Sequence, residues 1–367
     1  MKTTINKSER LMSIDALRGF DMLMIIFAER FFFALNLGAH TPLTGLMATQ
    51  FNHPEWFGFH IYDVIMPLFL FIVGVVIPFS IGKRLREAPT KAYLYPHMFK
   101  RFVILFILGW IVQGNLLDLD INKFQIFSNT LQAIAVGYFF TVVAYIHLNR
   151  NGRYILFGLC LVVYAMLLTL PNVPGVGRSE LLPDKNFALY VDHLILGRFN
   201  DGLQYTWILS GIGFTATTLA GLFAGEILQS AFLPKKKILY LVGFGVLGIL
   251  AGLVWGIWHP IIKKIWTSSF VLVQGGIGFL LMALFYWLID VKKYKKWAFP
   301  LKVIGMNAIT AYVMSHVFNM SQIASYFVFG LQQYVGAYYE LTRTVAGFLI
   351  FYFFLWYLYK NKTFIKI

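Results

Sequence analysis

Residues 64–82 read VIMPLFLFIVGVVIPFSIG, an apolar run without a single acidic or basic side chain. A helix needs about 20 such residues to cross the hydrocarbon core of a membrane. The rest of the chain has the same character, since 59% of its 367 residues are hydrophobic and only 13% are charged. Soluble domains carry about 25% charged residues. We therefore predict an all-α, polytopic membrane protein.

We predict about ten transmembrane helices, at about 19–37, 60–82, 99–117, 130–148, 153–170, 207–230, 238–257, 268–290, 299–318 and 341–359. Lysine and arginine concentrate in alternate connectors. Of the 31 basic residues, 21 lie in the segments 1–10, 83–101, 149–153, 235–237, 291–296 and 360–367. Cytoplasmic connectors carry such an excess, so both termini are predicted to be cytoplasmic. The net charge of +15 is then a topology signal with contact to the anionic lipid bilayer, and no nucleic-acid partner is expected.

Residues 1–367 are predicted to form a single transmembrane domain, because the sequence contains no soluble domain, low-complexity tract or internal repeat. The extracytoplasmic connector 171–206 is rich in proline, glycine and charge, and it is long enough to form a lid. Segment 319–340 is apolar but short and irregular, which favours a re-entrant or interfacial piece. Small residues recur between 211 and 252 and predict close helix packing.

A histidine and two carboxylates, His53, Glu55 and Asp63, lie where the first two spans are joined. Ionisable groups at a membrane-embedded position are costly unless they pair or face water, so they indicate a functional site. Other polar residues gather at the outer ends of the spans: Glu29, Arg30, His60, Gln113, Asn115, Asn129, Gln132, Asp201, Gln204, His259, Lys263, Lys264, Asn307 and His316. Together they predict a polar chamber that opens outward.

Each polar residue also has a structural interpretation. Asp15 and Arg18 are spaced i, i+3 and can pair across one helical turn. Asparagines within spans can simply hydrogen-bond neighbouring helices, an interpretation that is as well supported as catalysis. The sequence has no HxxxH or HExxH pair and Cys160 has no ligand neighbours, so no metal is expected.

Six blocks of sequence occur in a fixed order along the chain. They are RLMSIDALRG at 10–19, HPEWFG at 53–58 followed by Asp63 and Pro67, LQAIAVGY at 131–138, ATTLAG at 216–221, KIWTSSFV at 264–271 and GMNA at 305–308. In this order they resemble the heparan-α-glucosaminide N-acetyltransferase family and its bacterial relatives, which are transmembrane acyltransferases. Two positions depart from the family: Ala133 where many relatives have arginine, and Glu29 where animal members have asparagine.

The resemblance implies an acetyl-CoA-dependent N-acetyltransferase. Such an enzyme moves acetyl from cytoplasmic acetyl-CoA to the amine of a terminal glucosamine or related amino sugar on the far side of the membrane. It also implies a bacterial inner-membrane protein, a homodimer, and an acceptor released from a glycosaminoglycan such as heparan sulfate or from the cell wall. By charge alone, the basic residues expected to bind the CoA nucleotide include Arg18, Arg84 and Arg101.

Within the resemblance, His53 acts as a general base, or as a nucleophile that carries the acetyl group. Asp63 or Glu55 orients it, and Asn307, Asn129 or Gln132 donates to the oxyanion. The expected catalytic set is His53, Asp63, Glu29 and Asn307. The expected acceptor-binding set is Glu55, Trp56, Asn129, Gln132, Lys263, Lys264 and Trp266. Two alternatives stay open: an amino-sugar transporter, and an O-acyltransferase that modifies a polysaccharide or lipid.

Overall fold

The computed structural model describes residues 11–87 and 90–364. Within these residues, nine helical stretches are long and apolar enough to cross a membrane. They are Met12–Ala39, Ile61–Glu87, Lys91–Val112, Thr130–His147, Arg150–Thr169, Ser210–Gln229, Pro234–Gly256, Ser268–Val291 and Met320–Lys360. The prediction of an all-α polytopic membrane protein is confirmed.

The ninth predicted span, 299–318, is not one helix. It is divided into α12 (Phe299–Met306) and α13 (Ala308–Val317), and Asn307 between them has non-helical backbone angles of φ −113° and ψ 21°. The Asn307 side chain donates from Nδ2 to the Val303 carbonyl at 3.0 Å and the Leu355 carbonyl at 3.3 Å. An interrupted backbone in a membrane-length segment needs such compensation, because lipid offers no hydrogen bonds.

The first predicted span, 19–37, starts too late and ends too early. The helix begins with α1 (Met12–Leu23), passes through a π-helical turn η1 (Met24–Ala28) and continues as α2 (Glu29–Ala39). Its early residues include buried Asp15 and Asp21, which lowered the apparent hydropathy of this part of the chain. These residues are helical because α1 packs along α12, so the polar start is covered by another segment.

The centre of the bundle is the pair α4 (Ile65–Glu87) and α9 (Ser210–Gln229), which are buried over most of their length. They approach closely because glycines face backbone: a Cβ added to Gly74 would lie 2.0 Å from the Thr218 carbonyl oxygen. Small residues permit this approach, as the sequence predicted. The other spans therefore pack around α4 and α9.

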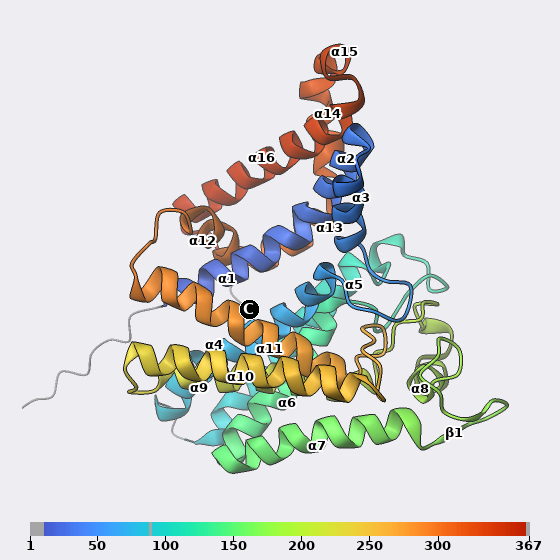
Figure 1. Cartoon of the computed structure of the whole chain (residues 1–367), viewed down its shortest axis with the longest axis vertical. Coiled ribbons are helices and arrows are strands. Elements are labelled where there is room, and N and C mark those ends of the chain that lie inside the picture. Colours follow the sequence, from blue (N-terminus) through green and yellow to red (C-terminus); the bar gives the residue numbers. More distant parts are fainter. Residues whose placement is uncertain (1–10, 88–89, 365–367) are drawn as a thin grey trace, which may run out of the picture.

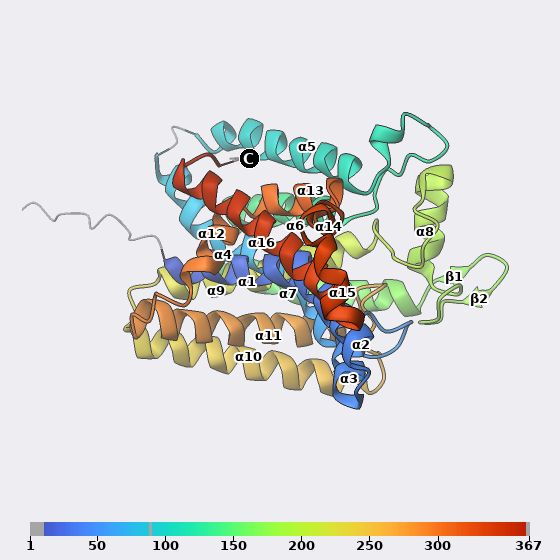
Figure 2. The ribbon, with the colours of Figure 1, turned by 90° about the horizontal axis from the view of Figure 1, so that it is seen from above.

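The outer layers are visible in two perpendicular views. Helices α10 (Pro234–Gly256) and α11 (Ser268–Phe285) run side by side along one face (Figure 1). Helix α5 (Tyr95–Val112), which packs on α6 (Thr130–His147), lies at the opposite edge in Figure 2. Helix α7 (Arg150–Thr169) packs on α9, and α16 (Tyr339–Lys360) packs on α2 and α12.

The connectors at one end of the bundle carry most of the irregular structure. Helix α3 (Pro42–Gln50) leads into a loop and the short helix η2 (Ile61–Val64). The connector 171–206 contains the hairpin β1 (Asn172–Val173) and β2 (Gly177–Arg178), then α8 (Phe187–Leu196). Figure 1 shows α8 and β1 at the end of the bundle opposite the start of α1 and the end of α16.

Segment 319–340 is made of short helices. It comprises α14 (Met320–Val328), η7 (Phe329–Leu331), α15 (Gln332–Val335) and η8 (Gly336–Tyr338), and α14 packs against α16. In Figure 1 these elements project beside α2 and α3 at one flank. Their placement in a re-entrant or interfacial position stays a prediction.

Candidate active site

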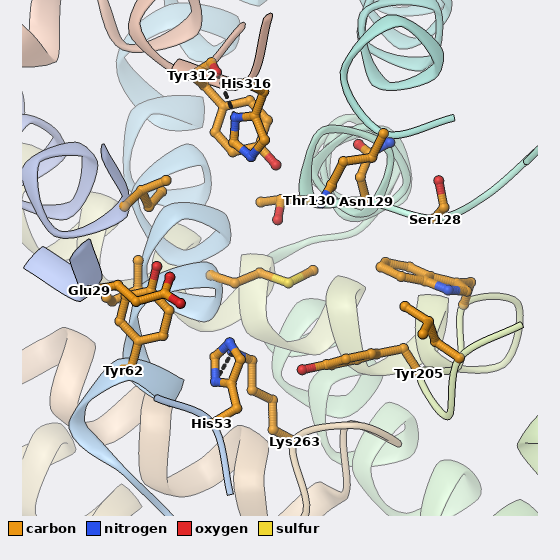
Figure 3. A pocket seen from close by; sticks show the side chains of 16 residues that line it. Glu29, His53, Tyr62, Ser128, Asn129, Thr130, Tyr205, Lys263, Tyr312 and His316 are labelled. Atoms are coloured by element: carbon orange, nitrogen blue, oxygen red, sulfur yellow. Dashed lines mark hydrogen bonds between the residues drawn. The ribbon is translucent and has the colours of Figure 1, made fainter. Parts of the chain in front are cut away.

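A polar cavity of about 340 Å³ lies at the end of the bundle where α8 is found. Figure 3 shows it from close by. Its walls come from parts of the chain that are far apart in sequence. The lining residues are Ile25, Glu29, His53, Tyr62, Ile65, Met66, Gln113, Ser128, Asn129, Thr130, Leu203, Tyr205, Trp207, Lys263, Tyr312 and His316. The sequence predicted an outward-opening chamber built from the ends of spans. Most of these residues do lie at span ends or in connectors, but Ile25 and Glu29 lie inside the span Met12–Ala39 and Tyr312 lies inside α13.

His53 and Asp63 form a hydrogen-bonded pair in the cavity wall. The His53 Nδ1 lies 2.7 Å from Asp63 Oδ1, and Asp63 is completely buried. The second carboxylate oxygen, Oδ2, accepts the backbone N–H of His60 at 2.9 Å, because Asp63 closes a capping box at the start of η2. An ionised carboxylate only accepts, so Nδ1 carries the proton and Nε2 keeps its lone pair. This geometry orients the imidazole.

The surroundings favour a neutral imidazole. Burial lowers the pKa of His53 below its usual value of 6.5, and the nearby Lys263 ammonium acts in the same direction. The hydrogen bond to Asp63 opposes this shift but does not reverse it. At neutral pH, His53 is therefore able to accept a proton at Nε2.

Lys263 lies directly against this pair. Its Nζ is 3.1 Å from His53 Nε2, 3.2 Å from His53 Nδ1 and 3.6 Å from Asp63 Oδ1. The side chain comes from the loop between α10 and α11. A hydrogen bond from the Ile262 N–H to Thr267 Oγ1 stabilises this loop. Burial lowers the pKa of the Lys263 ammonium to about 8, and Asp63 limits the shift.

The remaining walls are polar and aromatic. Glu29 enters the cavity from the first residue of α2, directly after the π-helical turn, a type of helix irregularity that is frequent at functional sites. In Figure 3, Glu29 and Tyr62 lie on one side of the cavity, and Tyr312 and His316 of α13 lie across it from His53. Hydroxyl, carboxylate and ring groups thus surround the imidazole.

The amides predicted to serve as oxyanion donors are already engaged. Asn129 caps α6, and its Nδ2 donates to the Gly109 carbonyl at 2.9 Å and to Gln132 Oε1 at 3.1 Å. Gln132 donates to the Ile126 carbonyl at 2.8 Å and does not line the cavity. Asn307 is buried at the break between α12 and α13 and is not brought to the cavity either.

Some of the predicted acceptor-binding residues line the cavity, and the others lie outside it. Trp56 is buried and donates from Nε1 to the Leu181 carbonyl at 2.8 Å, which links the His53 loop to the connector 171–206. Lys264 donates to Gln204 Oε1 at 3.2 Å. Trp266 donates from Nε1 to Thr217 Oγ1 at 3.2 Å, whereas Glu55 is exposed. Of the predicted acceptor-binding set, Asn129 and Lys263 line the cavity.

The three basic residues predicted to bind CoA lie at the other end of the bundle. Arg84 is exposed in the last turn of α4, and Arg101 stacks on the Tyr138 ring with its guanidinium 4.2 Å from the centroid. Arg18 on α1 lies 3.9 Å from Asp15, the i, i+3 pair expected from the sequence. The structure does not bring these three residues together with His53.

Several lining residues were not singled out from the sequence. Tyr62, Ser128, Thr130, Tyr205, Trp207 and Tyr312 belong to this group. The chain has 20 tyrosines and 9 tryptophans, so residue type alone could not identify those that line a cavity. Among the described residues, no group of three or more histidine, cysteine or acidic side chains is arranged to hold a metal ion.

A bundle of apolar helices with a half-buried histidine hydrogen-bonded to a buried carboxylate defines an integral, multi-pass membrane protein with an enzyme-like site. Residues 10–241 match the profile of the family described as "Heparan-alpha-glucosaminide N-acetyltransferase, catalytic", and the chain belongs to this family. The match includes Glu29, His53, Asp63 and Tyr205 but ends before Lys263.

Two relatives carry the same description. The heparan-alpha-glucosaminide N-acetyltransferase of Homo sapiens is 25% identical to this chain, over 98% of the chain and 60% of its own length. The Mus musculus protein of that name is 24% identical, over 100% of the chain and 62% of its own length. The chain thus spans about three fifths of the length of these curated relatives.

Proposed function

We propose that this protein is a transmembrane N-acetyltransferase. It transfers acetyl from cytoplasmic acetyl-CoA to the amine of a terminal glucosamine or related amino sugar on the extracytoplasmic side. The observation that carries the proposal is the His53–Asp63 pair in a cavity at the end of the bundle opposite the basic connectors. Family membership supports the reaction type.

The chemistry follows from the orientation of His53. The acceptor amine attacks the thioester carbonyl while His53 Nε2 takes up its proton. The new C–N bond forms, the C–S bond breaks, and the His53 imidazolium returns the proton to the sulfur, so that CoA leaves as the thiol and His53 is neutral again. Asp63 keeps the proton of His53 on Nδ1 and stabilises the imidazolium that forms, because its carboxylate is only 2.7 Å away.

The acceptor side of the cavity suits an amino sugar. Glu29 supplies a negative charge that attracts a protonated sugar amine, and Tyr62, Ser128 and Thr130 supply hydroxyl groups. Tyr205 adds an aromatic face from the connector 171–206. A polyhydroxylated ring needs this combination of hydrogen-bonding groups and flat apolar surface.

The proposed location of the CoA-binding site rests on the distribution of basic residues. CoA is polyanionic, and the basic connectors that include Arg84 and Arg101 lie at the end of the bundle away from the cavity. The nucleotide would bind among them and the slender pantetheine arm would extend between helices toward His53. Electrostatic attraction of this kind also speeds the encounter with a charged substrate.

The test is acetyl transfer from radiolabelled acetyl-CoA to glucosamine by the purified full chain in lipid nanodiscs. We expect transfer by the wild type and a loss of about 10²–10⁴-fold in kcat for His53→Ala. His193→Ala is the matched control, because His193 is an exposed histidine of α8 that does not line the cavity. It should retain wild-type activity.

Three results would each contradict part of the proposed function. Full activity of His53→Ala would remove His53 from the chemistry. Absence of transfer by the wild type to every amino sugar tried, together with uptake of labelled sugar into proteoliposomes that lack a donor, would identify a transporter. A product that is stable to acid but labile to base would be an O-acetyl ester and would identify a hydroxyl acceptor.

A further inference from the structure

We propose that Lys263 is a second catalytic residue, whose ammonium group stabilises the oxyanion that develops on the acetyl carbonyl. This inference rests on the proposed function. It assigns to Lys263 a role in the reaction itself, beyond contact with the acceptor.

The first argument is that the two asparagines predicted to donate to the oxyanion already use their amide hydrogens elsewhere. Attack of an amine on a thioester places negative charge on the carbonyl oxygen, and acyl-transfer sites provide donors at that point. Both hydrogens of the Asn129 Nδ2 are engaged, by the Gly109 carbonyl and by Gln132. Those of Asn307 Nδ2 are engaged by Val303 and Leu355, away from the cavity.

The second argument is the position of Lys263. Among the described residues that line the cavity, it is the one lysine or arginine. Its Nζ is 3.1 Å from His53 Nε2, the atom that must contact the acceptor amine. An amine hydrogen-bonded to Nε2 attacks a carbonyl carbon about 3 Å away. That carbonyl oxygen then falls within reach of the ammonium, which has three donors.

The third argument is burial. The Lys263 side chain is only 7% exposed, and its charge is balanced by Asp63 at 3.6 Å. A cation in such a site acts with little screening, so its effect on a developing negative charge is larger than in water. A solvated surface lysine would contribute far less.

The proposal makes the reaction depend on two protonation states. His53 must be neutral to accept the amine proton, and Lys263 must be charged to stabilise the oxyanion. The groups that face Lys263 are His53 from the connector, Asp63 and Tyr62 from η2, Glu29 from α2 and Tyr205 from the connector 171–206. The ammonium has a pKa of about 8, so the rate should fall as pH rises through this value.

The test is the pH dependence of kcat for the wild type and for Lys263→Met and Lys263→Arg. The wild type should show an alkaline limb near pH 8. We expect Lys263→Met to lose about 10²–10³-fold in kcat and to lack this limb. Lys263→Arg should keep more activity, and its limb should move beyond pH 10, because a guanidinium stays protonated.

Lys123→Met is the matched control. Lys123 lies in a connector at the same end of the bundle, its side chain is 61% exposed, and it pairs with Asp118 at 3.5 Å. Binding of radiolabelled CoA and a single symmetric peak in size-exclusion chromatography establish that each variant is folded. Should Lys263→Met fail this criterion, Lys263→Gln replaces it, because its uncharged amide removes the cation but keeps a polar group beside buried Asp63.

Two results would overturn the proposal. One is a Lys263→Met enzyme with wild-type kcat and an unchanged alkaline limb. The other is an unchanged plateau with only the acidic limb moved upward, because Lys263 would then merely tune the pKa of His53. Failure of the proposed function itself is recognised separately, since in that case the wild type transfers no acetyl group at any pH.

Discussion

Replacing Gly221 by alanine should separate the two central helices. A Cβ at this position would lie 1.9 Å from the Phe71 carbonyl oxygen and 2.7 Å from its carbonyl carbon. Both atoms belong to the backbone of α4, so no rotamer change can relieve the clash. Ordinary van der Waals contact begins at 3.4 Å, so α4 and α9 must move apart by about 1.5 Å at this crossing.

Two opposing terms determine the size of the effect. Alanine is favoured over glycine in a helix interior by about 1 kcal/mol. Overpacking typically costs ~1–3 kcal/mol, and more when backbone must move. Because α4 and α9 are buried over most of their length, the neighbouring helices have to shift as well. We therefore expect a net loss of about 2 kcal/mol in the free energy of unfolding, at the upper end of the difference between these terms, because backbone has to move.

The assay is the thermal unfolding midpoint of the purified protein in detergent, read by fluorescence-detected size-exclusion chromatography. Gly221→Ala should lower Tm by roughly 3 °C. Gly243→Ala on α10 is the control, because a Cβ there meets nothing within 4 Å. It should leave Tm unchanged or raise it slightly. A Gly221→Ala protein as stable as the Gly243→Ala protein would refute the close approach of α4 and α9.

Three further predictions concern the cavity and the connector 171–206. Burial raises the pKa of Asp192 to about 7, so its stabilising contribution is complete below the ordinary value of 3.8 and is lost as pH rises to about 7. Asp192→Asn should flatten the fall in Tm between pH 4.5 and 7.5, and an equal fall in both proteins would contradict this. Trp56→Phe removes the donor to the Leu181 carbonyl and should cost about 1 kcal/mol while raising KM for the acceptor. Trp258→Phe is the control, because Trp258 is exposed, and it should change neither the stability nor the KM for the acceptor. Glu29→Gln should lower kcat/KM for glucosamine by about tenfold, as expected for loss of one charge interaction, and no change would exclude an electrostatic contact with the amine.

The transmembrane architecture could be predicted because lipid imposes a simple rule on sequence. Long uncharged runs such as 64–82 must be helical to satisfy their backbone. The errors fall where polar residues are covered by distant segments. Asp15 lies before the predicted start of the first span, but α12, which lies nearly 300 residues later, packs over α1, and Asp15 is interior.

The candidate site could be predicted only in part, for a related reason. His53 and Asp63 are ten residues apart, so their proximity followed from local sequence. Lys263 was noticed as a polar residue at a span end, although its contact with His53 bridges 210 positions. Asn129, Gln132 and Asn307 looked equivalent to it by the same criterion. Their amides prove to be used by carbonyl groups that only the folded chain brings near.

The π-helical turn Met24–Ala28 determines which side of α2 faces the cavity while α1 keeps its own orientation. A π turn accommodates one residue more than an α turn, and each residue of an α-helix advances the side chains by about 100°. The turn therefore changes the rotational phase of the helix. Helix α1 keeps its face against α12 while α2 directs Glu29 into the cavity. If the same residues formed a regular α-helix, α1 would stay in place and Glu29 would turn about 100° out of the cavity, whereas deleting one residue of the turn would restore a regular helix with the α2 side chains near their present directions.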